Sequence, residues 1–141
     1  MIDASVAVKL VLPEEPLTRA AESLLVDPGG HEGGWATPGL FDIECASAIA
    51  SAVRRGRVGR DAAADGLDHL LALPIARFPM SALARVAWQL SLDLTVSVYD
   101  ACYVALADVL ELPLVTADEK LIRRLEGTRH SAVFLGVFGE A

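Results

Sequence analysis

The 141-residue sequence contains little cysteine, little histidine and no long apolar run. Cys45 and Cys102 both lie in apolar helical patterns, so we expect buried thiols and no disulfide. The three histidines pair neither with each other nor with cysteine, which disfavours a zinc site. No uncharged apolar stretch approaches the roughly 18 residues of a membrane span, and no signal-peptide pattern opens the chain. We therefore expect a cytoplasmic protein with no membrane association.

The chain also has few basic residues. Nineteen acidic residues against 12 basic ones give a net charge of −7, which argues against a protein held on nucleic acid by bulk electrostatics. A nuclease is not excluded, because a metal ion can reverse the local sign of the charge. The segment RRGRVGR carries Arg54, Arg55, Arg57 and Arg60. It is consistent with a solvated helix end stopped by Gly56 or with a rim that contacts phosphates.

Hydrophobic residues make up 53% of the chain, which is typical of a folded globular protein. The alternation of short apolar strands with helical patterns predicts an α/β fold and one domain over residues 1–141. We expect a central, mainly parallel sheet of about four to five short strands with helices on both faces. Pro38 is expected to start a helix and Ser81 to cap one. Helices are expected at 5–12, 16–25, 38–55, 59–73, 81–92, 97–110 and 117–127; strands at 1–3, 35–37, 75–78, 113–116 and 132–136; and a loop at 27–34.

Asp100 lies in the 97–110 helix, which is apolar almost all round and therefore expected to be buried. Tyr103 and Val104 follow it at helical spacing, so no base on the helix neutralises its charge. A buried carboxylate without compensation costs several kcal/mol and tends to take up a proton. The sequence therefore predicts that something outside this helix compensates Asp100.

Three further acids, Asp3, Glu44 and Asp118, also lack a base at helical spacing. Glu44 has small residues around it, including Ala48, which leave space above its carboxylate. Asp118 follows the apolar strand 113–116. Other acids have an arginine three or four residues away, which is an ordinary exposed pair: Glu15, Glu22, Asp61, Glu119 and Glu126.

Parallel sheet topology brings the four acids together. Asp3 and Asp118 are expected at the carboxyl ends of parallel strands, the edge at which open α/β sheets bind ligands. Glu44 and Asp100 lie in the first turns of helices, which begin at the same edge. Oxygen ligands without Cys or His suit a hard divalent ion, Mg²⁺ or Mn²⁺. One pocket with a metal ion would supply the missing countercharge.

Each acid also has an ordinary structural interpretation. Asp100 or Asp118 alone fits a helix cap or a first-turn acid, Asp3 a solvated charge near the chain start, and Glu44 a half-exposed side chain beside Asp42. The coincidence of all four at one edge favours a site. We expect the remaining unexplained acids to lie outside it: Asp42, Asp93 and Asp108.

Four segments, DASVAVKL, P-x-L-F-x-x-E, VYDACYVALA and LVTADEKL, resemble the PIN domain, and specifically the VapC toxins of bacterial toxin–antitoxin pairs. The resemblance covers nearly the whole chain. It implies a Mg²⁺-dependent endoribonuclease whose acidic quartet falls on Asp3, Glu44, Asp100 and Asp118. The family's hydroxyl positions fall on Ser5 and Thr116, which are expected to orient the carboxylates. Family members usually have a longer apolar strand before the first acid.

The expected reaction is metal-assisted phosphodiester hydrolysis. Asp3 and Asp100 would be the main metal ligands, and Asp118 and Glu44 would complete the shell directly or through water. The ion would lower the pKa of a bound water and stabilise charge on the phosphoryl oxygens. The family pattern implies products with 5′-phosphate and 3′-hydroxyl ends.

The resemblance also implies partners: an RNA substrate, a cognate VapB-like antitoxin in a hydrophobic groove, and a second copy in a homodimer. DNA contact is expected only through the antitoxin, because the chain is acidic and shows no helix-turn-helix signature. Two alternatives remain open. A receiver-type signalling domain also gathers acids at strand ends, although the Lys that it needs at a later strand end is missing. A catalytically silent toxin homologue would act as an antitoxin-bound corepressor.

Overall fold

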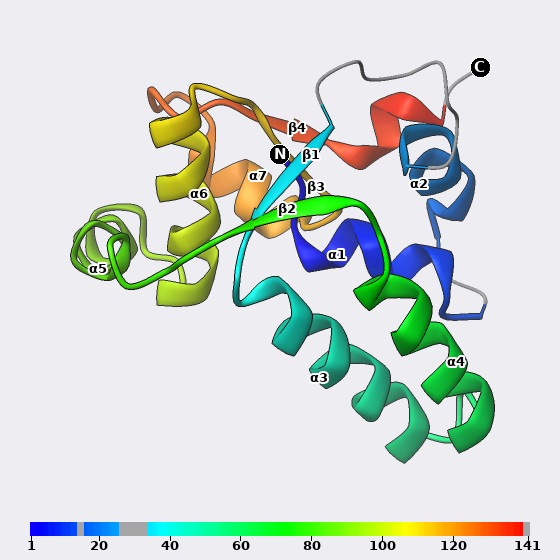
Figure 1. Cartoon of the computed structure of the whole chain (residues 1–141). Helices are drawn as coiled ribbons and strands as arrows, with labels where there is room; N and C mark the ends of the chain where they lie inside the picture. Colours follow the sequence, from blue (N-terminus) through cyan, green and yellow to red (C-terminus); the bar gives the residue numbers. More distant parts are fainter. Residues whose placement is uncertain (14–15, 26–33, 140–141) are drawn as a thin grey trace.

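The computed structural model describes residues 1–13, 16–25 and 34–139. Nearly every position of the expected loop at 27–34 lies outside these residues. The helices and strands follow the order expected from the sequence (Figure 1). They are α1 (Ala4–Ala7), the 3-10 helix η1 (Val8–Leu10), α2 (Thr18–Leu25), β1 (Trp35–Pro38), α3 (Phe41–Arg54), α4 (Arg60–Leu71), β2 (Ile75–Phe78), α5 (Ala84–Leu94), α6 (Val98–Leu110), β3 (Leu114–Thr116), α7 (Glu119–Leu125), β4 (Ala132–Phe134) and the 3-10 helix η2 (Leu135–Phe138).

The first residues of the chain join two pairs of parallel strands. β1 pairs with β2, and β3 pairs with β4. Ile2 forms a parallel bridge with Val115, and its backbone N–H donates to the carbonyl of Ala36 at 3.2 Å. The order across the sheet is therefore β2, β1, residues 1–3, β3 and β4. The mainly parallel sheet is confirmed, and the segment just before Asp3 lies between β1 and β3.

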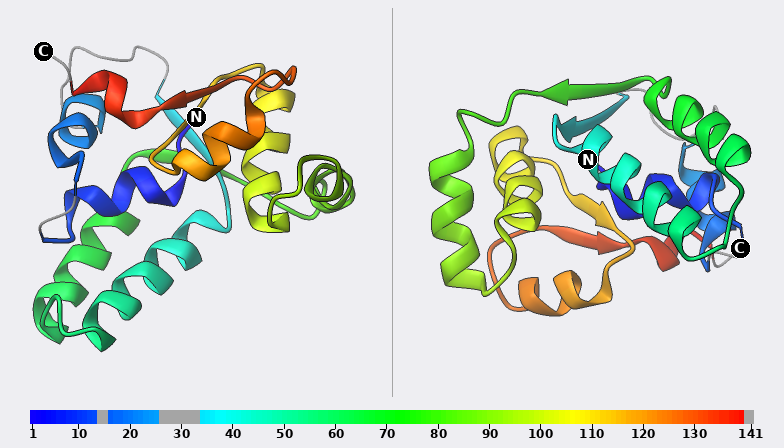
Figure 2. Two further views of the ribbon diagram at one scale, coloured as in Figure 1. Left: turned by 180° about the vertical axis from the view of Figure 1, so that it is seen from behind. Right: turned by 90° about the horizontal axis from the view of Figure 1, so that it is seen from below.

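In the described part of the chain, the sheet separates two apolar clusters. Consecutive strand residues point to opposite faces. Met1 and Leu114 pack with α5, α6 and α7, whereas Ile2 and Val115 pack with α1 to α4. The two groups of helices lie on opposite sides of the sheet in both orientations of Figure 2. Helices on both faces are therefore confirmed, and the acids at the strand ends lie between the two groups.

Two helix starts differ from the expected ones. Pro38 is the last residue of β1, and α3 begins three residues later, at Phe41, with Leu40 at its N-cap. Proline fixes φ near −65°, which suits the end of a strand as well as the first turn of a helix. Ser81 lies in the turn before α5, and the N-cap of that helix is Leu83. Neither difference moves an acidic residue out of its element.

The pair formed by α3 and α4 projects from the sheet (Figure 1). Arg54 ends α3, and Gly56 follows with φ of 71°, a left-handed conformation that favours glycine. This confirms that RRGRVGR marks a helix end. Glu44 lies in the first turn of α3, about 15 Å from Arg54 at 1.5 Å per residue. The arginine cluster therefore does not border the acidic site.

Among the described residues, no single helix has the length and apolar character needed to cross a membrane. In these ranges one pair, α5 and α6 taken together, meets those two criteria, and the two helices are bent by 111° at their junction.

Candidate active site

The four predicted acids border one pocket. Asp3, Glu44, Asp100 and Asp118 line a cavity of about 200 Å³ together with the hydroxyl groups of Ser5 and Tyr103. The acids come from the end of the first strand segment, the start of α3, the start of α6 and the start of α7. The strand order β1, residues 1–3, β3 brings these chain ends to one edge of the sheet, as expected for parallel strands.

Asp3 is the most deeply placed of the four acids, with 7% of its surface exposed. It is the N-cap of α1 and accepts a hydrogen bond from the N–H of Val6 at 3.3 Å. The pKa of Asp3 is raised to about 6 in all: burial raises it most and the negative charge of Glu44 adds a little, while the hydrogen bonds from Ser5 and Thr116 oppose the rise. Asp3 is thus a carboxylate that lacks a countercharge.

Two hydroxyl groups connect the strand ends. The Oγ of Ser5 donates to Asp3 Oδ1 at 2.5 Å, accepts from the N–H of Ala117 at 2.9 Å, and lies 3.3 Å from Thr116 Oγ1. Thr116 Oγ1 accepts from the N–H of Asp118 at 3.0 Å. Ser5 therefore holds the Asp3 carboxylate, and Thr116 holds the backbone of Asp118. These contacts are of the orienting kind expected for the two hydroxyls.

Glu44 has a partner that sequence reasoning missed. The phenolic hydroxyl of Tyr103 donates to Glu44 Oε2 at 2.5 Å. Burial raises the pKa of Glu44, the hydrogen bond from Tyr103 opposes that rise, and the charge of Asp100 adds to it. Tyr103 was noted on the sequence only as a neighbour three residues after Asp100. A tyrosine on a largely apolar helix was the available signal, because a buried phenol needs a hydrogen-bond partner.

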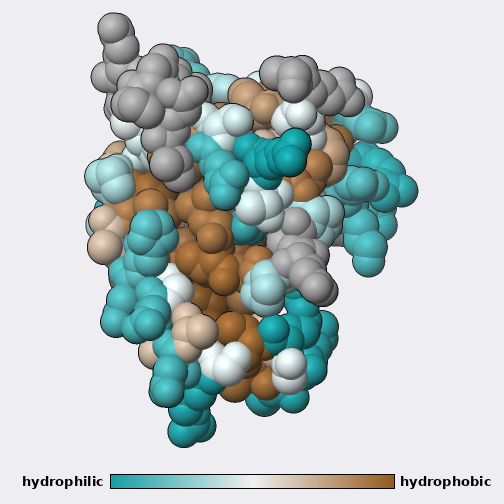
Figure 3. Space-filling view, turned by 90° about the vertical axis from the view of Figure 1, so that its right-hand side faces the viewer, coloured by the Kyte–Doolittle hydropathy of each residue, from teal (hydrophilic) through white to brown (hydrophobic). Residues whose placement is uncertain are grey.

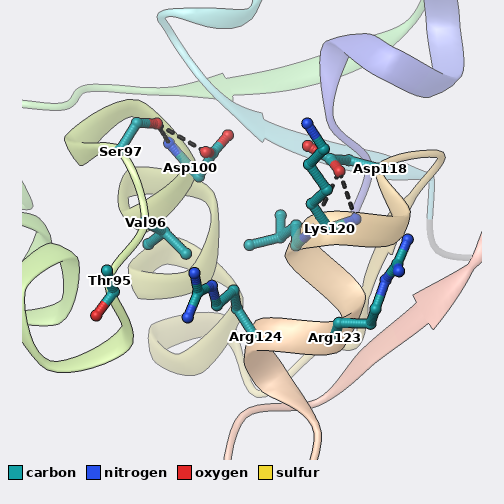
Figure 4. A pocket seen from close by; sticks show the side chains of 9 residues that line it. Thr95, Val96, Ser97, Asp100, Asp118, Lys120, Arg123 and Arg124 are labelled. Carbon is teal, nitrogen blue, oxygen red and sulfur yellow. Dashed lines mark hydrogen bonds between the residues drawn. The ribbon is translucent and has the colours of Figure 1, made fainter.

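Asp100 is half-buried, and not fully buried as the helical pattern suggested. Ser97 caps α6: its Oγ accepts from the N–H of Asp100 at 3.0 Å and donates to Asp100 Oδ2 at 2.7 Å (Figure 4). Asp118 caps α7 in the same way, accepting from the N–H groups of Lys120 and Leu121. Both acids therefore have structural roles at helix starts while also bordering the pocket.

The donor set fits a hard divalent cation in its chemistry. All four side chains offer carboxylate oxygens, and within the described residues no lysine, arginine or histidine forms an ion pair with any of them. In the same part of the chain, however, no three His, Cys, Asp or Glu side chains are already placed to hold a metal ion. Protein donors already bond at least one carboxylate oxygen in each of the four acids.

The acids expected outside the site lie outside it. Asp42 forms an ion pair with Arg77 of β2 at 2.9 Å, and the carboxylate of Asp108 lies 2.8 Å from Nδ1 of His130. Asp93 is exposed. Cys45 is fully buried, and burial raises the pKa of its thiol to about 12, so it is a packing residue and not a nucleophile.

Comparison with known proteins agrees with this arrangement. The family model of the PIN domain matches residues 1–127. Ribonuclease VapC12 of Mycobacterium tuberculosis is 35% identical over 86% of this chain and 88% of its own length. Ribonuclease VapC9 of the same species is 36% identical over 86% of this chain and 87% of its own length. These matches remove the basis for a receiver-type interpretation.

Among solved structures, the crystal structure of PAE2754 from Pyrobaculum aerophilum superposes with a TM-score of 0.70. The superposition covers 96% of this chain and 90% of the PAE2754 chain, at 23% sequence identity, and so shows that the two proteins share a fold. The PIN-domain model matches residues 1–127, and the similarity to the VapC ribonucleases extends over most of the chain. We conclude that this chain is a VapC-type member of the PIN-domain family.

Proposed function

We propose that the chain is a Mg²⁺-dependent endoribonuclease, the toxin of a VapBC-type pair, that hydrolyses RNA phosphodiester bonds. The observation that carries the proposal is the meeting of four carboxylates from four separate elements at one pocket. The names of the relatives, Ribonuclease VapC12 and Ribonuclease VapC9, support the choice of RNA as substrate. Products with 5′-phosphate and 3′-hydroxyl ends are expected from the family resemblance.

In this proposal Asp3 and Asp100 are the main ligands for Mg²⁺, or for Mn²⁺ in its place, and Asp118 and Glu44 complete the set directly or through water. When bound, the ion supplies a water of lowered pKa and stabilises negative charge on the phosphoryl oxygens. Ser5 keeps the Asp3 carboxylate oriented through its 2.5 Å hydrogen bond. Thr116 fixes the backbone from which Asp118 projects.

The remaining residues of the pocket control position and access. Tyr103 restrains Glu44, so that this carboxylate faces the pocket and not the core. Asp100 is more exposed than Asp3 and stands at the mouth, where an incoming phosphate arrives first. The apolar side chains of Val8 and Ala48 complete the wall. They keep bulk water away from the inner carboxylates, which strengthens electrostatic interactions there.

A cognate VapB-like antitoxin is the proposed inhibitor. Figure 3 shows apolar surface between polar borders on the face that carries α2, η2 and α4. Part of it is a cavity of about 590 Å³ that includes Leu17, Ala20, Phe134 and Val137. An amphipathic antitoxin segment would fit such a surface. Any contact with DNA belongs to the antitoxin in this proposal, and the pair is assigned to the cytoplasm.

A homodimer is the other proposed assembly. Trp88 and Leu92 of α5 are 53% and 63% exposed, and Tyr99 at the start of α6 is 65% exposed. Large apolar side chains at such exposure are typical of an interface with another chain.

The test compares the wild type with Asp100→Asn after brief expression, by mapping the 5′ ends of cellular RNAs. New 5′-phosphate ends that arise only with the wild type support the proposal. Purified protein with Mg²⁺ should reproduce the same cuts, and EDTA should abolish them. Equal cleavage by both proteins would refute the site assignment, and no cleavage by either would favour the silent corepressor.

A further inference from the structure

A second cavity adjoins the acidic pocket and shares two of its acids. It has a volume of about 560 Å³, and Asp100 and Asp118 border both cavities. One wall is the segment 95–97, which joins α5 to α6. The opposite wall is α7, with Lys120 and Arg124 (Figure 4). An extended ligand bound in this cavity would therefore continue into the acidic pocket.

The cations of α7 differ in what they already bind. Arg123 forms an ion pair with Glu119 at 3.1 Å and points away from Asp100 in Figure 4. Arg124 points from α7 toward the segment 95–97. Across residues 1–13, 16–25 and 34–139, ion pairs reach neither Lys120 nor Arg124. These two side chains are four residues apart, so they lie on one face of α7.

The walls of this cavity combine three kinds of contact. Lys120 and Arg124 supply positive charge, Val96 supplies apolar surface, and the hydroxyl of Thr95 supplies a hydrogen-bonding group. Leu121 also lines the cavity but is 3% exposed, and the hydroxyl of Ser97 already donates to Asp100. A positively charged groove that follows the backbone is one of the usual means by which proteins bind single-stranded nucleic acid. An acidic peptide would match the cations alone and would leave the apolar wall unused.

We propose that this cavity binds the single-stranded RNA segment next to the scissile phosphate, with Arg124 and Lys120 holding its backbone. The inference rests on the proposed ribonuclease function and adds the residues that position the substrate. Arg124 and Lys120 are positioning residues, since they lie beside the acids and not among them. The guanidinium of Arg124 can pair with a phosphate in bidentate geometry or stack on a base, neither of which a lysine reproduces fully.

The test uses a random-sequence, fluorescein-labelled RNA pool of about 12 nucleotides with the full-length protein and Mg²⁺. Initial fluorescence anisotropy reports binding, and its later decay reports cleavage in the same sample. Arg124→Ala is expected to weaken binding about tenfold. It should also reduce the magnitude of the slope of log K against log [KCl], measured between roughly 50 and 200 mM KCl, by about 0.7. Lys120→Ala should reduce the salt dependence similarly. Arg124→Lys should restore the salt dependence and only part of the affinity.

Arg60→Ala is the matched control, because it removes the same exposed charge from the start of α4, away from both cavities. Binding and salt dependence that are the same for Arg124→Ala and Arg60→Ala would overturn the inference, as would a wild type that binds no RNA. The inference would also be overturned if Arg124→Ala weakened the binding of a poly-glutamate peptide, measured by its competition with the RNA, but left RNA binding unchanged. If the wild type binds RNA but the anisotropy does not decay afterwards, the nuclease proposal is contradicted. The comparison of Arg124→Ala with Arg60→Ala would still show whether this cavity binds RNA.

Discussion

The hydroxyl of Tyr103 on α6 donates a hydrogen bond of 2.5 Å to Glu44 on α3, 59 residues earlier in the chain. Tyr103 is 2% exposed and belongs to the apolar cluster of α5, α6 and α7, whereas α3 packs with the opposite cluster. The bond therefore joins helices from the two sides of the sheet at the acidic pocket. It also gives a buried phenol its partner and holds a carboxylate toward the pocket.

Replacing Tyr103 by phenylalanine removes only this hydroxyl. We expect the free energy of unfolding to fall by about 1.5–3 kcal/mol, the usual range for a hydrogen bond to a charged group. The Mg²⁺ concentration needed for half-maximal RNA cleavage should rise about tenfold, because an orienting contact is lost. Urea denaturation and a Mg²⁺ titration measure the two effects. Tyr99→Phe, at an exposed tyrosine of the same helix, should change neither.

Asp100→Asn should reduce RNA cleavage by at least about 100-fold, since it removes a charge at the metal site. The fold should persist, because the side chain can still accept the hydrogen bond from Ser97. Thermal melting followed by circular dichroism checks the fold, and gel analysis of cleaved RNA checks activity. Asp93→Asn makes the same chemical change at an exposed acid of α5 and should cleave at the wild-type rate. Native activity in Asp100→Asn would remove this residue from the mechanism.

The stability of the metal-free protein should depend on pH through Asp3. Its folded-state pKa of about 6 lies above the ordinary value of 3.8, so the folded chain binds this proton more tightly than the unfolded chain. The resulting stability is complete below about pH 4 and is lost as the pH rises through 6, a loss of about 3 kcal/mol.

Asp3→Asn isolates this effect, because asparagine stays uncharged and can still accept from the N–H of Val6. In EDTA, urea denaturation from pH 4 to 7.5 should show a smaller loss of stability for the variant than for the wild type. Parallel curves for the two proteins would mean that Asp3 keeps its ordinary pKa.

Adding Mg²⁺ at pH 7.5 should stabilise the folded protein. A ligand that binds only the folded state contributes about 2.7 kcal/mol at a concentration 100 times its Kd. Mn²⁺ should act in the same way, whereas KCl of equal ionic strength should not. Differential scanning fluorimetry measures the shift, which Asp100→Asn should diminish and Asp93→Asn should preserve. An equal shift in both variants would place the metal elsewhere.

The four acids were predictable from the sequence because each lacked a base nearby and each fell at a strand end or a helix start. The parallel sheet then brings such positions to one edge whatever the details of the loops. Depth within the fold was not predictable. A helical projection gives the direction in which Asp100 points but not its distance along the axis from the core, and the first turn of α6 extends beyond that core. Val98 is accordingly 42% exposed, although it lies in the helix that was expected to be buried because it is apolar almost all round.

Contacts between distant elements also escaped prediction. The partner of Glu44 is Tyr103, and no spacing rule connects residues of two helices that pack on different faces of a sheet. For α7, the sequence predicted an exposed ion pair between Glu119 and Arg123, which the structure confirms. That local pair gave no indication that Arg124, the next residue, borders a cavity beside Asp100.

The position of residues 1–3 between β1 and β3 has a consequence for synthesis. Asp3 is translated before β3, but its backbone N–H donates to the carbonyl of Val115, and Ser5 accepts from the N–H of Ala117. The acidic pocket therefore cannot form until β3, more than 100 residues later in the chain, has been translated. A chain that stops before β3 would lack the contacts that hold Asp3, so under the proposed function it would have no nuclease activity.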